Sequence, residues 1–205
     1  MLLIDKPVGL SSFAVVARVR RQLNVQRVGH AGTLDPLASG LLIVLVGRAE
    51  TKSQDRFMKL DKEYVVTIEL GKISTTDDSE GEITSTKFQF PNLKQFTGKI
   101  QQIPPAYSAI HVNGERAYRL ARQGKPVTIA PRSVTIYCLE LLDYEKPFMT
   151  LQVQCSHGTY IRSLARAMGG YVTALRRTKI GTYDVSSAIS LDQIATAQNQ
   201  PLRQE

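Results

Sequence analysis

The stretch GHAGTLDPLASGLLIVLVG, residues 29–47, sets the fold of this chain. Its second half is an uninterrupted apolar run, which predicts a buried strand. Its first half is a loop with three glycines and one carboxylate, Asp35, with no second acid within six residues on either side. Pro36 restricts Asp35 to extended backbone, and the glycines permit sharp turns. The sequence therefore predicts a lone acid on a tight loop beside the core.

Two interpretations of Asp35 are compatible with this setting. An acid in such a loop is typical of an Asx turn or a helix cap, in which the carboxylate accepts backbone hydrogen bonds. The other interpretation is a catalytic carboxylate, which needs a cation to keep it ionised when a substrate excludes water. An arginine does this best, because its guanidinium can bind both carboxylate oxygens. The chain has many arginines, and spacing alone does not choose among them.

Hydrophobic periodicity predicts more strands than helices around this stretch. We expect strands at 64–71, 83–90, 133–144 and 148–156, helices at 13–23 (capped by Ser11 and Ser12), 117–123 and 157–170, and a last pair of short elements at 172–183 and 190–195. The acidic segment 72–82 fails the calcium-loop pattern and is interpreted as a hairpin connection. The predicted class is α+β, with a mixed, mainly antiparallel sheet flanked by helices.

Composition limits the cell compartment and the kind of partner. No apolar run approaches the ~18 residues of a membrane span, and the N-terminus lacks the apolar stretch of a signal peptide. Cys138 and Cys155 lack metal spacing and are interpreted as reduced structural thiols, so we expect a cytoplasmic protein. Lys and Arg outnumber Asp and Glu by 26 to 18, which favours a polyanionic partner, although an ordinary basic protein can have the same balance.

The common catalytic motifs are absent from the sequence. There is no GxxxxGK[ST] or GxGxxG loop for a nucleotide and no GxSxG elbow. The three histidines, His30, His111 and His157, have no second ligand at a metal spacing. We therefore expect no cofactor and no metal.

The segment from about 103 to 130 differs in composition from the rest of the chain. It combines prolines, glycines and basic residues with Tyr107 and Tyr118, and we expect an inserted lobe there. Aromatic rings among positive charges suit loop RNA, whose bases stack on rings while phosphates contact Arg or Lys. A surface excursion packed by its own tyrosines fits the same pattern.

Five motifs, in order, resemble those of the TruB family of tRNA pseudouridine synthases. They are LLIDKPVGLSS, GHAGTLDPLASGLLIVLVG, DKEYVVTIELG, IPPAYSAIHVNGERAYRLARQG, and CSHGTYIRSLAR followed by LRRTKIG. Together they span residues 2–190, and their joint order makes the resemblance specific where no single motif would be. The chain departs from the family pattern in a short segment before Leu175, where Ala167 replaces the usual acid.

The resemblance implies a cofactor-free isomerisation of a uridine in the T loop of tRNA, at tRNA position 55. The N1–C1′ bond breaks, the uracil turns, and it rejoins the sugar through C5. This chemistry needs a carboxylate at C1′ and a flipped-out base shielded from water. Whether the carboxylate attacks C1′ or abstracts a sugar proton is left open by the sequence.

The resemblance also assigns three catalytic residues. Asp35 matches the carboxylate of the family. Tyr64 matches the tyrosine that stacks on the target base, with its hydroxyl near the proton leaving C5. Arg162 matches the arginine that pairs with the catalytic acid and keeps it ionised.

Four further residues are expected to contact the substrate. His30 matches a histidine that enters the RNA loop when the uridine flips out. Tyr160 matches a tyrosine of the base pocket, and Leu175 its apolar floor. Lys6, in the LLIDKP motif, is assigned to RNA contact.

The resemblance further implies a domain organisation and a partner. We expect residues 1–190 to form the catalytic domain, including the 103–130 lobe, and 191–205 to form a short tail without the C-terminal RNA-binding module of many relatives. The expected partner is the T stem-loop of tRNA, bound by a monomer with no membrane contact. Rival readings are a non-catalytic RNA-binding or RNA-folding module, a guide-dependent relative, and a hydrolase that releases free uracil.

Overall fold

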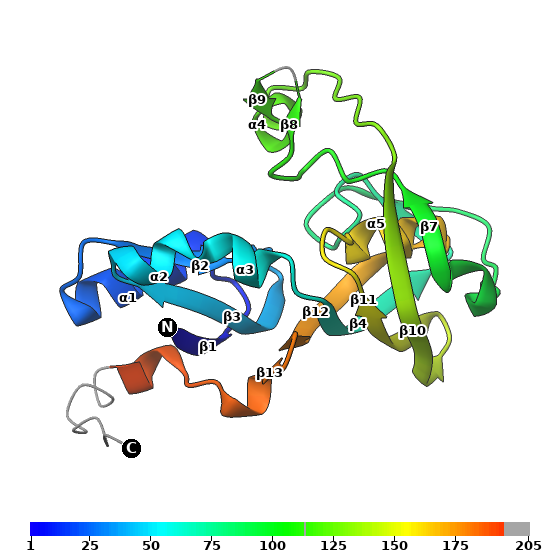
Figure 1. Cartoon of the computed structure of the whole chain (residues 1–205). Helices are drawn as coiled ribbons and strands as arrows, with labels where there is room; N and C mark the ends of the chain where they lie inside the picture. Colours follow the sequence, from blue (N-terminus) through cyan, green and yellow to red (C-terminus); the bar gives the residue numbers. More distant parts are fainter. Residues whose placement is uncertain (113, 195–205) are drawn as a thin grey trace. The chain divides into compact units, whose positions relative to one another are not determined.

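The computed structural model describes residues 1–112 and 114–194 (Figure 1). The chain forms two compact units. Unit 1 comprises Met1–Tyr64 and the chain from Leu175 onward, and unit 2 comprises Val65–Ala174. The boundaries between the units fall inside two strands, after Tyr64 and after Ala174.

Unit 1 is built around the apolar strand predicted after the Asp35 loop. Its elements are β1 (Leu2–Lys6), α1 (Ser12–Leu23), β2 (Val28–Ala31), β3 (Ala38–Val46), α2 (Arg48–Lys52), α3 (Gln54–Met58), the end of β12 (Gly170–Ile180), β13 (Tyr183–Asp184) and the 3₁₀ turns Val185–Ser187 and Leu191–Gln193. β3 pairs antiparallel with β1 and β2 and parallel with β12.

Helix α1 begins where the sequence predicts. The hydroxyl of Ser11 accepts a hydrogen bond from the backbone N–H of Ala14, which satisfies one free donor of the first turn. The helix ends at Asn24, which has the left-handed backbone typical of a C-terminal cap. Its three valines, Val15, Val16 and Val19, are buried.

Strand β3 is apolar at successive positions because both of its faces are covered. Leu42 and Val44 enter one hydrophobic cluster with the valines of α1. Leu41 and Ile43 enter a second cluster with Phe57 of α3. A strand covered on both faces has no reason to alternate polar and apolar residues, so this run is the core of unit 1.

The parallel pairing of β3 with β12 depends on a glycine. Gly40 lies opposite Arg177 in the ladder and has a φ of +100°. A β-carbon at position 40 would lie 2.3 Å from the backbone oxygen of Arg177. Only glycine combines this backbone angle with so close an approach.

Unit 2 contains most of the remaining strands. Its elements are β4 (Lys62–Leu70, from Val65), β5 (Lys72–Ser74), β6 (Ile83–Ser85), the 3₁₀ turn Leu93–Phe96, β7 (Gly98–Gln102), β8 (His111–Val112), β9 (Glu115–Arg116), α4 (Ala117–Arg122), β10 (Arg132–Glu145), β11 (Phe148–Cys155), α5 (Ile161–Ala167) and the start of β12. The strand order is β12–β4–β11–β10–β7. The β10/β11 and β10/β7 pairs are antiparallel, which confirms the predicted mixed, mainly antiparallel α+β class.

Three details of the sequence prediction are wrong. The segment from residue 83 pairs with β5 and not with β4, because Gly71, at φ +78°, turns the chain out of β4. Residues 172–183, expected as a short element, belong largely to the long strand β12. Leu191 and Ile194, at the start of the predicted tail, are buried in the core beside α1. The rest of that tail lies outside the described residues.

The predicted lobe forms an excursion between β7 and β10 that carries β8, β9 and α4 (Figure 1). The backbone N–H of Tyr118 donates to the carbonyl of Ser108, and the guanidinium of Arg122 lies 5.8 Å from the centre of the Tyr118 ring. The lobe is therefore partly packed by its own tyrosine while its basic side chains lie at the surface. Among the described helices, none is long and apolar enough to cross a membrane.

Replacing Gly40 with alanine is expected to lower the free energy of unfolding by at least about 2 kcal/mol, because the strained backbone and the collision with Arg177 add. Gly47→Ala is the matched control, since Gly47 has φ +90° but no atom within 4 Å of an added β-carbon. Urea denaturation of both variants measures the difference. Equal losses in the two would contradict a tight β3–β12 contact at Gly40.

Candidate active site

The Asp35 loop connects β2 to β3 and is held from one side by the chain before α1. The Ser12 hydroxyl accepts from the backbone N–H of Leu34 at 2.8 Å and donates to its carbonyl at 2.9 Å. The N–H of Gly9 donates to the carbonyl of Pro36 at 2.8 Å. Asp35, which lies between these contacts, is half-buried. The backbone on both sides of the carboxylate is therefore fixed.

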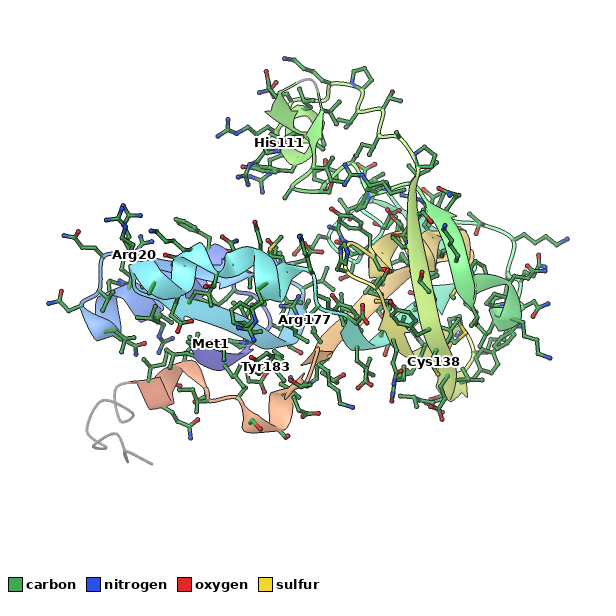
Figure 2. The ribbon with its side chains drawn as sticks, viewed as in Figure 1. Met1, Arg20, His111, Cys138, Arg177 and Tyr183 are labelled. Atoms are coloured by element: carbon green, nitrogen blue, oxygen red, sulfur yellow. The ribbon has the colours of Figure 1, made fainter. Side chains whose placement is uncertain are left out.

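A buried arginine holds the ends of the same loop. Arg177 donates from Nε to the carbonyl of Leu41 at 2.8 Å and from Nη2 to the carbonyl of Gly32 at 3.1 Å (labelled in Figure 2). Its side chain is 1% exposed. One guanidinium thus joins the start of the loop to the strand that follows it.

Arg177 is not among the site residues predicted from the sequence, although the sequence contains a signal for it. Successive residues of a strand face opposite sides, so the two arginines of LRRTKIG in β12 must separate. Arg176 forms a two-hydrogen-bond ion pair with Asp5, at 3.0 and 2.7 Å. Arg177 takes the buried side, where its charge is surrounded by backbone carbonyls.

Lys6 is the second buried cation beside this loop. Its ammonium donates to the carbonyls of Pro7 at 2.9 Å and Leu10 at 2.7 Å, and the side chain is fully buried. Burial lowers the pKa of Lys6 to about 8; the charge of Asp35 raises that pKa, and Arg177 lowers it further. The Asp35 carboxylate therefore has a cation of its own unit within electrostatic range. The assignment of Lys6 to RNA contact stays a prediction.

His30 lies in β2, five residues before Asp35, and is half-buried. Burial, and secondly the charge of Arg177, lower its pKa below the ordinary histidine value. Its Nδ1 is buried and has no hydrogen-bond partner among the described residues. The imidazole is therefore neutral at pH 7 with one nitrogen left unsatisfied in the protein.

Tyr64 and Leu175 complete the predicted residues of unit 1. Both side chains are 8% exposed. Leu175 lies opposite Ala38 in the β3–β12 ladder, which places it near the C-terminal end of the Asp35 loop. Tyr64 lies in β4, and its role as a stacking surface stays a prediction.

In unit 2, Arg162 is buried in the first turn of α5 and held by three groups. Its Nη1 donates to the carbonyl of Thr76 at 3.0 Å, and its Nη2 donates to the carbonyl of Tyr107 at 2.9 Å. The carboxylate of Asp78 lies 3.5 Å from Nη1, and both side chains of this ion pair are almost completely buried. Because Tyr107 belongs to the predicted lobe, Arg162 also ties the lobe to α5.

Contrary to the prediction, the acidic segment 72–82 does not join a hairpin of β4 and residues 83–85; it contains β5 itself and the turn that joins β5 to β6. Asp77 and Asp78 are buried, and Asp77 pairs with Arg166, one helical turn after Arg162. Burial raises the pKa of Asp77, against the lowering effect of Arg166 and Arg162. The composition of this segment is that of a solvated turn, so only the two arginines four residues apart on α5 could have indicated buried partners.

Tyr160 immediately precedes α5 and is fixed through its backbone. Its N–H donates to Oε1 of Gln102 at 2.8 Å, and its carbonyl accepts from Nε2 of Gln102 at 2.9 Å. Gln102 ends β7 and is buried. The backbone of Tyr160 is thus fixed, and the residue as a whole is half-buried.

The predicted site residues therefore fall into two groups. Unit 1 holds Asp35, Lys6, His30, Tyr64 and Leu175, and unit 2 holds Tyr160 and Arg162. The pairing of Arg162 with Asp35 joins residues of different units and stays a prediction. Within residues 1–112 and 114–194, no group of three or more His, Cys, Asp or Glu side chains could hold a metal ion. What unit 1 offers chemically is a carboxylate on a fixed backbone with a buried ammonium in its vicinity.

The chain matches one family model and resembles curated proteins that share one name. Residues 20–161 match the family model of the TruB family pseudouridylate synthase N-terminal domain. The chain is 45% identical to tRNA pseudouridine synthase B of Nitrobacter winogradskyi over 93% of its own length and 57% of the relative. It is 39% identical to tRNA pseudouridine synthase B of Protochlamydia amoebophila over 97% of its length and 80% of that relative.

Solved structures give the same fold. A chain of the Cbf5-Nop10-Gar1 complex superposes with a TM-score of 0.72 at 28% identity, over 95% of this chain and 53% of that one. A chain of an H/ACA RNP bound to a substrate RNA containing 2′-deoxyuridine superposes with a TM-score of 0.69 at 26% identity, over 95% and 52% of the two chains. The chain thus spans a little over half of each structural neighbour.

Lys6 is expected to titrate near pH 8 and to shift further down in Asp35→Asn. The sign follows from the charges, since the carboxylate of Asp35 raises the pKa of Lys6 and its removal leaves burial and Arg177, which both lower it. An NMR titration of labelled lysine side chains measures both values. Asp192→Asn, which removes a surface acid that pairs with Arg18, is the control. An unchanged Lys6 pKa in Asp35→Asn would contradict the proximity of the two charges.

Proposed function

The chain belongs to the TruB family of pseudouridylate synthases, and we propose that it converts a uridine of tRNA to pseudouridine. The substrate site is the T stem-loop, at tRNA position 55, and the enzyme acts in the cytoplasm as a monomer without a cofactor. The observation that carries the proposal is the Asp35 loop itself, which is fixed by Ser12 and by the buried Arg177 and carries a single half-buried carboxylate.

The reaction is an isomerisation, and its requirements match this loop. The N1–C1′ bond breaks, a C5–C1′ bond forms, the proton on C5 leaves and N1 ends with a proton, so no atom is gained or lost. Asp35 acts at the sugar, either as a nucleophile at C1′ or as a base that takes a sugar proton. Both routes need an ionised carboxylate in a fixed position, because its distance to the sugar determines the rate.

Cations make the ionised form of Asp35 favourable when RNA excludes water. Lys6 supplies one within unit 1. Arg162 supplies a second, oriented by Asp78 and two backbone carbonyls. A guanidinium held in this way loses little side-chain entropy when it meets a carboxylate.

The other predicted residues contact the flipped uracil or the RNA loop that it leaves. Tyr64 stacks on the flipped uracil, and Tyr160 and Leu175 form the rest of its pocket. His30 enters the space the uridine leaves in the RNA loop, at a cost of a few kcal/mol of base stacking. Because its pKa is lowered, the imidazole of His30 is neutral, so no charge has to be desolvated when it enters the RNA loop.

Asp35→Asn is expected to abolish turnover, by at least about 10³-fold, while tRNA binding stays within a few-fold of the wild type. The assay is tritium release from a tRNA transcript labelled at uridine C5, since that hydrogen leaves only when C5 bonds to the sugar. Binding is measured separately with unlabelled transcript. Release of tritium by Asp35→Asn at the wild-type rate would exclude Asp35 as the catalytic acid.

The same assay separates the rival functions. A non-catalytic RNA-binding or RNA-folding module binds the transcript without releasing tritium, and a hydrolase produces free uracil. A guide-dependent relative is inactive on bare transcript when no other component is added. Activity of the isolated chain on bare transcript would exclude all three.

Arg162→Ala is expected to lower the single-turnover rate at saturating tRNA by about 10²-fold or more, because Asp35 loses a charge partner in the closed site. Arg162→Lys keeps the charge but not the planar geometry, so a partial recovery is expected. Thermal unfolding of both variants controls for the lost pairing with Asp78. If only the affinity for tRNA changed, Arg162 would be a phosphate contact and not a partner of Asp35.

A further inference from the structure

The first turn of α1 presents a large aromatic side chain to solvent. Phe13 is 70% exposed, more than any other large apolar side chain of the described residues. Exposed apolar residues are common on protein surfaces, so exposure alone carries no conclusion. The position of Phe13 and the charges along its helix indicate a binding role for this side chain.

Phe13 directly follows the residue that joins α1 to the catalytic loop. Ser12 makes both of its hydrogen bonds to the backbone of Leu34, which precedes Asp35. Gly9, four residues before Phe13, bonds to the carbonyl of Pro36. The backbone of Phe13 is therefore fixed to the loop that carries the acid, and no flexible connection lies between them.

The surroundings of Phe13 in sequence are exclusively positive. Residues 6–34 contain five lysines and arginines and no acid. Along α1, residues 13, 17 and 21 fall on the face away from the buried valines. Arg18 lies to one side of this face and forms an ion pair with Asp192. Arg21 is exposed there, about 12 Å along the helix axis from Phe13. Arg20 is half-buried and donates to the carbonyl of Val28.

We propose that Phe13 is a stacking platform for an unpaired base of the substrate RNA, and that Arg21 contacts a phosphate of the same strand. The proposal rests on the proposed function, because it assigns a part of the RNA to this face. An exposed aromatic ring followed by a cation is the arrangement on which single-stranded RNA binds, with the base on the ring and the phosphate on the guanidinium.

The composition of the face favours RNA over a protein partner. Protein interfaces need a contiguous apolar centre, whereas Phe13 is followed on its face of α1 by Ala17 and then by Arg21. The exposed guanidinium of Arg21 gives this face a positive charge, which is complementary to a phosphate backbone. The occupant is therefore an unpaired nucleotide of the RNA whose target uridine reaches Asp35.

The test uses substitutions at exposed positions, which leave the hydrophobic core intact. Phe13→Ala and Phe13→Leu are expected to weaken the Kd for an unmodified tRNA transcript by about 5- to 100-fold, since both lose the aromatic face. Phe13→Trp keeps a ring and should bind within about threefold of the wild type. Arg21→Gln should reduce the slope of log K against log salt by about one.

Phe148→Ala is the matched control. Phe148 is also an exposed phenylalanine, at 42%, but it lies opposite Glu145 in the β10–β11 pair, next to a carboxylate that repels phosphate. Its replacement should leave both the Kd and the tritium-release rate unchanged.

A second measurement identifies the stacked nucleotide. The Kd of wild type and Phe13→Ala is compared on T stem-loops in which each unpaired loop nucleotide is replaced, one at a time, by an abasic sugar. The penalty of Phe13→Ala should disappear at one position, where the base that stacks is missing.

Each result supports or overturns the inference. If the wild type binds and modifies the RNA while Phe13→Ala and Phe13→Leu bind equally well, the platform is excluded and the proposed function stands. The same holds if Leu restores full affinity, because the contact is then merely apolar. A wild type that neither binds nor modifies the RNA overturns both proposals.

Discussion

The buried guanidinium of Arg177 is the interaction on which the candidate site depends. It bonds to Gly32 at the start of the Asp35 loop and to Leu41 in the strand that follows. Removing a charge from water costs several kcal/mol, and two carbonyl hydrogen bonds offset only part of that cost. The buried guanidinium joins the start of the Asp35 loop to β3, and Gly40 lets the backbone of Arg177 approach β3 closely enough for this contact.

In unit 2, one short turn likewise supports several side chains. Arg162 and Arg166, one turn apart on α5, each receive a carboxylate from the single turn at Asp77 and Asp78. This arrangement converts an acidic connection between two short strands into a support for α5. It also leaves the guanidinium of Arg162 oriented by three partners.

Much of this organisation was predictable from sequence, for identifiable reasons. The apolar run of β3, the cap at Ser11 and the alternation in β11 follow from periodicity and local hydrogen bonding. The partner of residues 83–85, the burial of Asp77 and Asp78 and the role of Arg177 were not predictable, because they depend on contacts between distant segments. Two of these left a signal in the sequence. Arg177 is one of two adjacent arginines in a strand, and the two arginines four residues apart on α5 indicate buried acidic partners. Family resemblance named Asp35, Tyr64 and Arg162, but it gave no account of how the chain holds Asp35 in place.

The central claim is that the carboxylate of Asp35 serves an isomerisation of one uridine in tRNA. The most direct measurement is to incubate the isolated chain with an unmodified tRNA transcript and to map pseudouridine by carbodiimide labelling and primer extension. The account predicts one new reverse-transcription stop, at position 55 in the T loop, with no change in RNA mass and no free uracil. An unmodified transcript, a modification outside the T loop, or released uracil would contradict it.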